Sequence, residues 1–421
     1  MNSAGDKLWS ATFAQLIFIE SMLQFGMYLT RPIISNYSLS LGASMSIAGF
    51  LAGLLATSAL AIRPVSGAIS DKLSKRTLLV ISCGLFSASA LGCALSNSLI
   101  ALGVCLALQG FAFAFKSTIV VSLASLVVPE KRIGAGVGLL GLAYTVACAI
   151  GPAVGSSIGK SFGYSAVFAA SFALLSLGFA FSIFLRIPKE RRELHEEGSR
   201  QATVKKKEAG NTSAYRTGKN RFSRLFGKFF YLPAIPLSLI AGLLMIAQGV
   251  TSSFILVVGE IRGIEEASLY FFFYSLATLA ARPLAGKASD AFGVKAVAIP
   301  MMLIAAAGMI AAALMDSFAG IVIAGVSMGI GQGSAYCAIQ AESIRGVPKS
   351  QLGRAANTFY IGPDLCMGLG PIAGGFILQA AGAGSMFLFN AGAIILALIL
   401  FSLYAKTLAC RFDAPSKSSW L

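Results

Sequence analysis

Several charged side chains stand inside long apolar runs of this chain, and they are the residues best suited to chemistry. Glu20, Arg31, Lys116 and Asp364 are the clearest cases. A charge in such surroundings is costly unless it faces protein, water or a ligand, so it usually belongs to a functional site. The only histidine, His195, lies in a polar segment, which leaves Glu20 and Asp364 as the carboxylates that could exchange a proton. Asp364 could instead be a permanent counter-ion for a basic residue.

Polar side chains accompany these charges at helical spacing. Glu20, Gln24 and Arg31 fall on one face of a predicted helix, and Gln109 shares a face with Lys116. Two later apolar runs carry further polar positions: Gln248, Ser252, Gln332, Tyr336 and Gln340. Each single glutamine also has a simpler interpretation as an interhelical hydrogen bond.

The composition indicates a membrane protein. Of 421 residues, 56% are hydrophobic and only 12% are charged, whereas a soluble domain has about 25% charged residues. Half of the net charge of +16 lies between Arg186 and Lys228, which hold thirteen Lys/Arg against five Glu. That pattern is typical of a basic segment beside a bilayer and argues against nucleic acid as a partner. The cysteines form no C-x-x-C pair, and neither a metal site nor a cofactor is expected.

The apolar runs predict an all-α membrane protein with twelve transmembrane helices. They cover approximately 9–35, 45–66, 77–96, 99–127, 134–159, 163–186, 233–258, 267–286, 295–315, 319–341, 353–378 and 384–406. Alternate connections are rich in Lys and Arg, while the opposite ones are short, uncharged or acidic. By the positive-inside rule, both termini and the central loop should be cytoplasmic, with the protein in a bacterial-type plasma membrane.

One stretch of sequence occurs twice. Arg63–Arg76 reads RPVSGAISDKLSKR, and Arg282–Lys295 reads RPLAGKASDAFGVK, 219 residues later. The same offset relates Gly151, Pro152, Gly155 and Gly163 to Gly370, Pro371, Gly374 and Gly382. A constant offset of this kind indicates two copies of one unit joined in parallel. We therefore expect a six-helix half over 1–186, a basic cytoplasmic linker over 187–230, and a second six-helix half with a short tail over 231–421.

The repeated connection resembles the signature between helices 2 and 3 of the major facilitator superfamily. Its positions are Gly67, Asp71, Lys72, Ser74, Lys75 and Arg76 in the first copy, and Gly286 and Asp290 in the second. The first G-P-x-x-G resembles the helix-5 motif of the drug:proton antiporter branch. The chain departs from the pattern at Ser74, which replaces a usual glycine, and at Ala291, which replaces a basic residue. Leu106 stands where the arginine of the helix-4 motif is expected.

This resemblance implies a transporter whose two halves rock about a central cavity lined by helices 1, 4, 7 and 10, where the polar positions fall. It also implies that Asp71 docks on the opposite half and closes the cytoplasmic side; the alternative is a solvated turn that only fixes topology. The G-P-x-x-G motifs could act as hinges or simply let helices pack closely.

We predict a secondary active transporter, in the first place one that couples the proton gradient to efflux of small organic or amphiphilic compounds. Arg31 and Lys116 motivate the alternative, a symporter or exchanger for a small organic anion. Lys116 has no counterpart in the second copy, where the offset lands on Ala335. It should therefore have a carboxylate, water or an anionic substrate as its partner.

An enzyme is disfavoured, because the sequence shows no intramembrane nucleophile–base pair, carboxylate–metal cluster or ATP-binding loop. A receptor without transport would differ by lacking substrate flux. The expected partners are a small-molecule substrate and the lipid bilayer, with the protein as a monomer.

Overall fold

The computed structural model describes residues 10–70, 74–128, 133–185, 231–345, 347 and 352–412, and every regular element among them is helical. The first group comprises α1 (Ala11–Thr30), the 3-10 turn η2 (Arg31–Ile33), α2 (Ile34–Ser40), α3 (Met45–Ser70), α4 (Lys75–Leu95), α5 (Leu99–Val127), α6 (Ile133–Phe162) and α7 (Tyr164–Ile183). The second comprises η4 (Leu232–Ala234), α10 (Ile235–Arg262), α11 (Leu269–Phe292), α12 (Val294–Leu314), α13 (Phe318–Ser327), the π segment η5 (Met328–Gln332), α14 (Gly333–Ile344) and α15 (Leu352–Phe412).

Nine segments among the described residues are long and apolar enough to cross a bilayer. Large apolar side chains such as Ile100 and Phe376 are exposed on the outside of the bundle, as expected where the neighbour is lipid and not water. Helices α1 and α11, within the predicted spans 9–35 and around 267–286, fall outside the nine, because polar residues such as Glu20 and Arg282 lower their hydropathy. The last two predicted spans both lie within α15, which has non-helical backbone at Gly382. The count of twelve crossings stays a prediction.

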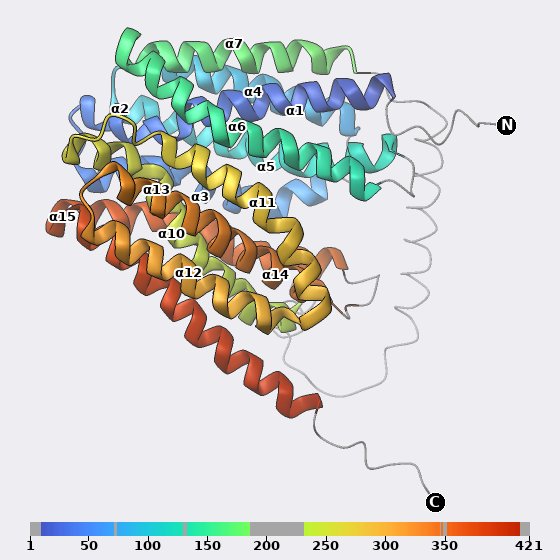
Figure 1. Cartoon of the computed structure of the whole chain (residues 1–421). Helices are drawn as coiled ribbons and strands as arrows, with labels where there is room; N and C mark the ends of the chain where they lie inside the picture. Colours follow the sequence, from blue (N-terminus) through green and yellow to red (C-terminus); the bar gives the residue numbers. More distant parts are fainter. Residues whose placement is uncertain are drawn as a thin grey trace, which may run out of the picture.

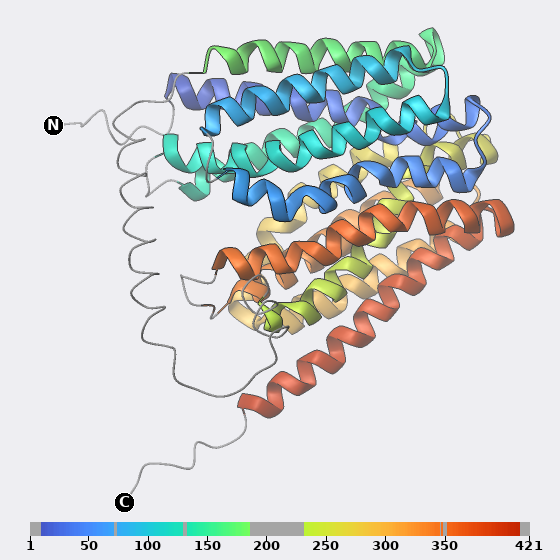
Figure 2. The same ribbon diagram turned by 180° about the vertical axis from the view of Figure 1, so that it is seen from behind.

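The helices form two groups that lie side by side (Figures 1 and 2). Helices α1 to α7 make the first bundle, and α10 to α15 make the second. The start of α1, the end of α7, the start of α10 and the end of α15 lie on one side, which we call the linker end (Figure 1). The opposite side, where α2 ends and α11 begins, is the far end.

The two bundles are joined by hydrogen bonds at the far end. Asn36 Nδ2 donates to Glu260 Oε1 at 2.6 Å, and Lys160 Nζ donates to the carbonyl oxygen of Glu265 at 3.2 Å. Ser46 Oγ donates to Oε1 of Gln379 at 3.2 Å.

Close backbone packing adds to the far-end contact. A Cβ on Gly49 or Gly53 of α3 would collide with the backbone of α15 at Pro371 or Gly368. Only glycine lets two helices approach so closely. The bundles are therefore held close together on the far side of the molecule.

Corresponding turns of the two bundles share an unusual backbone conformation. Gly163, between α6 and α7, has φ 85°, and Gly382, within α15, has φ 81°. An L side chain rarely adopts this left-handed region. The 219-residue repeat thus relates positions with the same conformational requirement.

The structure explains why Ser74 can replace the usual glycine of the motif. Ser74 has extended backbone with φ −64° and caps α4, since its Oγ accepts a hydrogen bond from Thr77 N at 3.1 Å. Its counterpart Gly293 instead has φ 84° between α11 and α12. The first copy therefore does not need the glycine that the second copy requires.

The G-P-x-x-G motifs lie at close helix contacts. A Cβ on Gly151 would stand 2.9 Å from Cβ of Tyr28, and one on Gly155 would collide with the carbonyl of Leu29. In the second bundle Gly374 packs on Val250 of α10 in the same way. These contacts favour the packing role of the motifs, α6 against α1 and α15 against α10.

Candidate functional site

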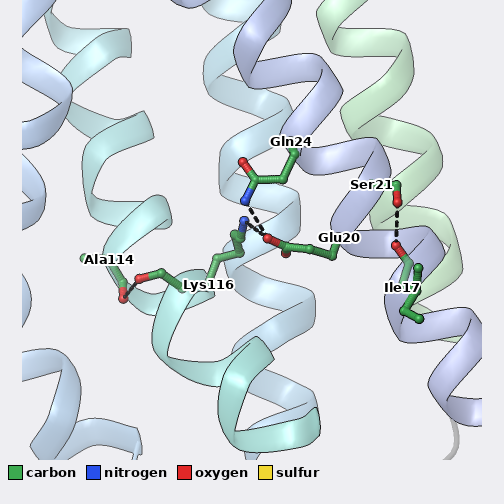
Figure 3. Close-up of polar contacts among 7 residues, drawn as sticks. Ile17, Glu20, Ser21, Gln24, Ala114 and Lys116 are labelled. Carbon is green, nitrogen blue, oxygen red and sulfur yellow. Dashed lines mark hydrogen bonds and ion pairs between the residues drawn. The ribbon is translucent and has the colours of Figure 1, made fainter. Parts of the chain in front are cut away.

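A buried charge cluster joins α1 to α5 (Figure 3). Lys116 Nζ lies 2.8 Å from Glu20 Oε1, and Gln24 Nε2 donates to the same oxygen at 2.6 Å. Only 3% of the Lys116 side chain and 8% of the Glu20 side chain are exposed. Lys116 therefore has a carboxylate partner, one of the three kinds of partner expected from the sequence.

The cluster lies within the first bundle and is incompletely satisfied. Glu20 Oε2 and Gln24 Oε1 are buried and accept no hydrogen bond from any described residue. Lys116 Nζ stands 5.7 Å from the centre of the Phe113 ring. The charges of Lys116 and Glu20 also act electrostatically on the buried thiol of Cys83 in α4. Because the carboxylate neutralises Lys116, this ammonium is a poor direct ligand for a substrate anion.

The structure separates Arg31 from the other polar residues of its predicted stripe. Helix α1 ends at Thr30, and Arg31 begins the 3-10 turn that carries Pro32. The Arg31 guanidinium lies 6.0 Å from the centre of the Tyr28 ring. It lines a small cavity of about 10 Å³ together with Tyr28, Pro32, Cys148, Gln248, Ser252, Phe271 and Met367. Arg31 of the first bundle thus meets Gln248 and Ser252 of the second bundle at this cavity.

A second arginine, Arg282, lies in α11, which packs against α6. Arg282 of α11 is close enough for its charge to act on the hydroxyls of Tyr144, Tyr274 and Tyr336. Tyr144 in turn contacts Tyr28 edge to face, with ring centres 5.5 Å apart. We call Arg31, Arg282, Tyr28, Tyr144, Tyr274 and Tyr336 the arginine–tyrosine cluster.

The polar residues predicted on the tenth span surround the second-bundle side of this cluster. Tyr274 Oη donates to Gln332 Oε1 at 3.4 Å, and Gln340 Nε2 donates to Tyr360 Oη at 2.5 Å. Gln332 ends the π segment η5, which interrupts the predicted helix between α13 and α14. Such π segments are frequent at functional sites.

Two other predicted residues lie in different surroundings. Asp364 of α15 is half-buried and acts electrostatically on Tyr336, so it borders the arginine–tyrosine cluster and not Lys116. Gln109 of α5 is buried, and its Nε2 has no acceptor among the described residues. Neither residue joins the Glu20–Lys116 pair.

The predicted gate falls partly outside the described residues. Asp71 and Lys72 are not described, and for Asp290 only the backbone, within α11, is described. Gly67 lies in α3 and Gly286 in α11, while Lys75 and Arg76 open α4. Arg76 Nη2 donates to the carbonyl of Ile183 at 2.5 Å, which ties the start of α4 to the end of α7.

Arg282, Tyr28, Tyr144 and Tyr274 were not among the predicted site residues, whereas Tyr336 was. The signal for Arg282 was available, because this charge lies inside the predicted span 267–286. The tyrosines gave no comparable signal, since aromatic residues are common in any membrane bundle.

The comparison with known protein families identifies the family of this chain. The family model described as Major Facilitator Superfamily matches residues 16–273 and again residues 237–418. The chain belongs to this superfamily. A curated relative, the inner membrane transport protein YajR of Escherichia coli (strain K12), is 27% identical over 137 residues. That match spans 31% of this chain and 30% of YajR.

Solved structures of superfamily transporters share the fold. A POT family transporter in complex with a thioalcohol-conjugated peptide has a TM-score of 0.74 at 14% identity, covering 94% of this chain and 96% of the other. The nucleoside transporter NupG gives 0.70 at 16% identity, over 93% and 99% of the two chains. A bacterial homologue of the human lysosomal transporter Spinster gives 0.72 at 15% identity, over 97% and 98%. The chain is thus a multi-pass membrane transporter by family.

Proposed function

We propose that the chain is a proton-coupled secondary transporter whose six-helix halves, 1–186 and 231–421, alternate access to a site between them. The 187–230 linker would connect them in the cytoplasm of a bacterial-type cell, and twelve helices would cross the plasma membrane. The two family matches, over the overlapping ranges 16–273 and 237–418, and the equivalent conformations of Gly163 and Gly382 support this organisation. Structures of this fold also include transporters bound to small molecules.

The buried Glu20–Lys116 pair is the observation that carries the proton coupling. Two opposite charges at 2.8 Å in an apolar bundle are stable only together. Protonation of Glu20 would leave Lys116 as an uncompensated buried charge, which disfavours this arrangement of α1 and α5. Proton binding would therefore shift the equilibrium toward the other access state. Asp364 is the second candidate for the same role.

The conformation described here fits the state that faces the cytoplasm. Three hydrogen bonds between the bundles and the close packing of α3 on α15 lie at the far end, which positive-inside topology would place outside the cell. In the opposite state we expect Asp71, with Lys72, Lys75 and Arg76, to close the linker end.

Two features bear on the direction of transport and the class of substrate, the helix-5 motif and Arg31. The helix-5 motif Gly151-Pro152-x-x-Gly155 favours efflux of small organic or amphiphilic compounds by antiport. The alternative is a symporter or exchanger of a small organic anion, which the position of Arg31 beside the central cavity supports.

Proteoliposomes with a trapped pH-sensitive dye test the coupling. Dipeptides, nucleosides, amphiphilic cations and small organic anions would be added one at a time. A transported compound should change the internal pH with the wild-type protein and not with empty liposomes. Glu20→Gln should abolish the pH change because it removes the group that carries the proton.

Glu266→Gln is the matched control, because Glu266 is an exposed carboxylate in the far-end loop. It should behave like the wild type. Uptake of a radiolabelled compound without any proton movement, in the wild type as well, would contradict coupling and indicate a uniporter or exchanger.

A further inference from the structure

A cavity of about 300 Å³ lies between the two bundles at the far end. The first bundle contributes Asn36 of α2 and Tyr164 of α7 to its lining, and the second contributes Glu260 of α10 and Glu265 of the loop after α10. It shares no lining residue with the small cavity beside Arg31. The far-end cavity is therefore a separate place where a ligand could bind.

Asn36 presents a buried hydrogen-bond acceptor at this cavity. Only 4% of the residue is exposed, and its Nδ2 donates to Glu260 Oε1 at 2.6 Å. Because a carboxylate only accepts hydrogen bonds, this contact fixes the orientation of the amide. Asn36 Oδ1 is thus left buried, with no donor among the described residues. Such an acceptor is costly unless a ligand donates a hydrogen bond to it.

The charged groups around the cavity favour a positively charged ligand. Glu260 and Glu265 supply two negative charges against the one positive charge of Lys160. Lys160 Nζ donates to the backbone carbonyl of Glu265 at 3.2 Å. The ion pairs between described side chains include neither Glu260 nor Glu265. A cationic ligand would therefore meet carboxylates that no described cation neutralises.

The size and the remaining walls of the cavity favour an organic cation over a bare metal ion. Ile33, Leu256 and Ile264 give it apolar walls, and the ring of Tyr164 can face a cation. A single metal ion would leave most of the cavity empty. Nor do the described residues contain a group of three His, Cys, Asp or Glu side chains suited to hold a metal.

We propose that the far-end cavity binds the ammonium group of a small organic amine, which donates hydrogen bonds to Asn36 Oδ1 and to the Glu260 carboxylate. The carbon part of the amine lies against the apolar walls. Asn36 and Glu260 belong to different bundles, so the bound amine bridges them beside their own hydrogen bond. In the proposed topology this site faces outside the cell, and an amine bound there would slow the opening of the far end. The site goes beyond the proposed function, since it is neither the central cavity nor the proton-coupling pair.

Binding can be measured on the purified full-length protein in nanodiscs of neutral phosphatidylcholine, where both faces reach the solution. The probes are phenethylamine and butylamine, with 2-phenylethanol as the uncharged isostere of phenethylamine and sodium chloride as the inorganic cation, all at neutral pH and constant ionic strength. We expect at least one amine to raise the unfolding temperature, and 2-phenylethanol and sodium to leave it unchanged.

Variants on both sides of the cavity test the two predicted contacts. Glu260→Gln keeps an acceptor for Asn36 and removes the charge, so it should weaken amine binding by about tenfold or more. Asn36→Ala removes the buried acceptor and should weaken binding by roughly fivefold. If Asn36→Ala does not fold, Glu265→Gln removes a cavity charge without removing a hydrogen bond between the bundles, and it should weaken binding by about twofold.

Glu266→Gln serves as the control here too, because Glu266 is an exposed carboxylate next to Glu265 that does not line the cavity. It should bind the amine like the wild type. Equal binding of 2-phenylethanol and phenethylamine, an equal effect of sodium, no binding of either amine, or amine binding unchanged in Glu260→Gln would overturn the site.

These outcomes are independent of proton coupling, because the binding measurement requires neither substrate flux nor proton movement. Loss of the amine site would leave the coupling untouched. Amine binding that depends on Glu260, in a protein that moves no protons, would support the site and contradict the coupling.

Discussion

The Glu20–Lys116 pair is specific to the first half of the molecule. The 219-residue offset carries Lys116 onto buried Ala335 and Glu20 onto exposed Leu239. A feature needed by the fold, such as the positive-φ glycine of Gly163 and Gly382, is present in both halves. A charged pair found in only one half is better explained by function than by folding.

The charges of this pair should stabilise the protein only as a pair. We expect Glu20→Gln alone to lower the free energy of unfolding by about 3 kcal/mol, because it leaves Lys116 buried without a counter-charge. The double variant Glu20→Gln/Lys116→Met should recover most of that loss and still fail to transport. Thermal unfolding of the three purified proteins measures this, and a double variant no more stable than Glu20→Gln would contradict the interpretation.

At the residue scale, part of the site could be predicted from the sequence. Lys116 needed a partner because of its burial, and the structure provides Glu20, a residue on the predicted polar face of the first helix. The pairing itself was not predictable, since Asp364 was an equal candidate from spacing alone. Arg282 was not predicted as a site residue, because in the sequence it begins the repeated Arg-Pro motif and is explained there as part of a helix connection.

At the element scale, the two copies of the repeated motif connect their helices by different backbone conformations. Ser74 supplies a side-chain cap in ordinary backbone conformation, while Gly293 supplies a left-handed turn. A sequence motif alone does not distinguish these solutions, because both serine and glycine are common where a helix begins.

This difference predicts unequal effects of the reciprocal exchanges. Ser74→Gly should cost only a few tenths of a kcal/mol, because glycine is a tolerated N-cap. Gly293→Ser should cost about 1–2 kcal/mol, because it places a side chain in the left-handed region. Thermal unfolding of the purified variants would show the asymmetry, and equal losses would refute it.

Close packing of α6 on α1 gives a second prediction at this scale. Gly155→Ala should destabilise the protein by about 1–3 kcal/mol, since its Cβ would collide with the carbonyl of Leu29. Gly141→Ala in the same helix is the control, because nothing lies within 4 Å of a Cβ there. Similar unfolding temperatures for the two variants would count against the packing role of the motif.

Helix positions were predictable from apolar runs, but the interruptions within helices were not. The first span breaks at Arg31 and the tenth at Met328–Gln332. Pro32 explains the first interruption locally. The second depends on tertiary packing, in which Gly329 fits against Tyr274 and Gly331 against Ala305, and a single sequence does not reveal such contacts.

At the scale of the whole molecule, the loop charges predict the orientation. Reporter fusions after Arg200 and after Lys417 should both read as cytoplasmic, because an even number of crossings and the positive-inside rule place both there. A periplasmic signal at either position would contradict the proposed topology.

Alternating access requires one end of the molecule to open while the other end closes. In the conformation described, the far end is held together by the Asn36–Glu260 hydrogen bond and by the packing of α3 on α15. Protonation of Glu20 should favour the state in which the far end separates and the linker end closes.

Spin-label distance measurements on a cysteine-free background test this claim most directly. One pair, at the exposed positions Phe162 and Ile261, reports on the far end, and another, at Ala11 and Phe292, reports on the linker end. On acidification the far-end distance should lengthen while the linker-end distance shortens, and Glu20→Gln should show the acidic distribution at neutral pH. Distances that do not respond to pH, or a Glu20→Gln protein that keeps the full pH response, would contradict the account.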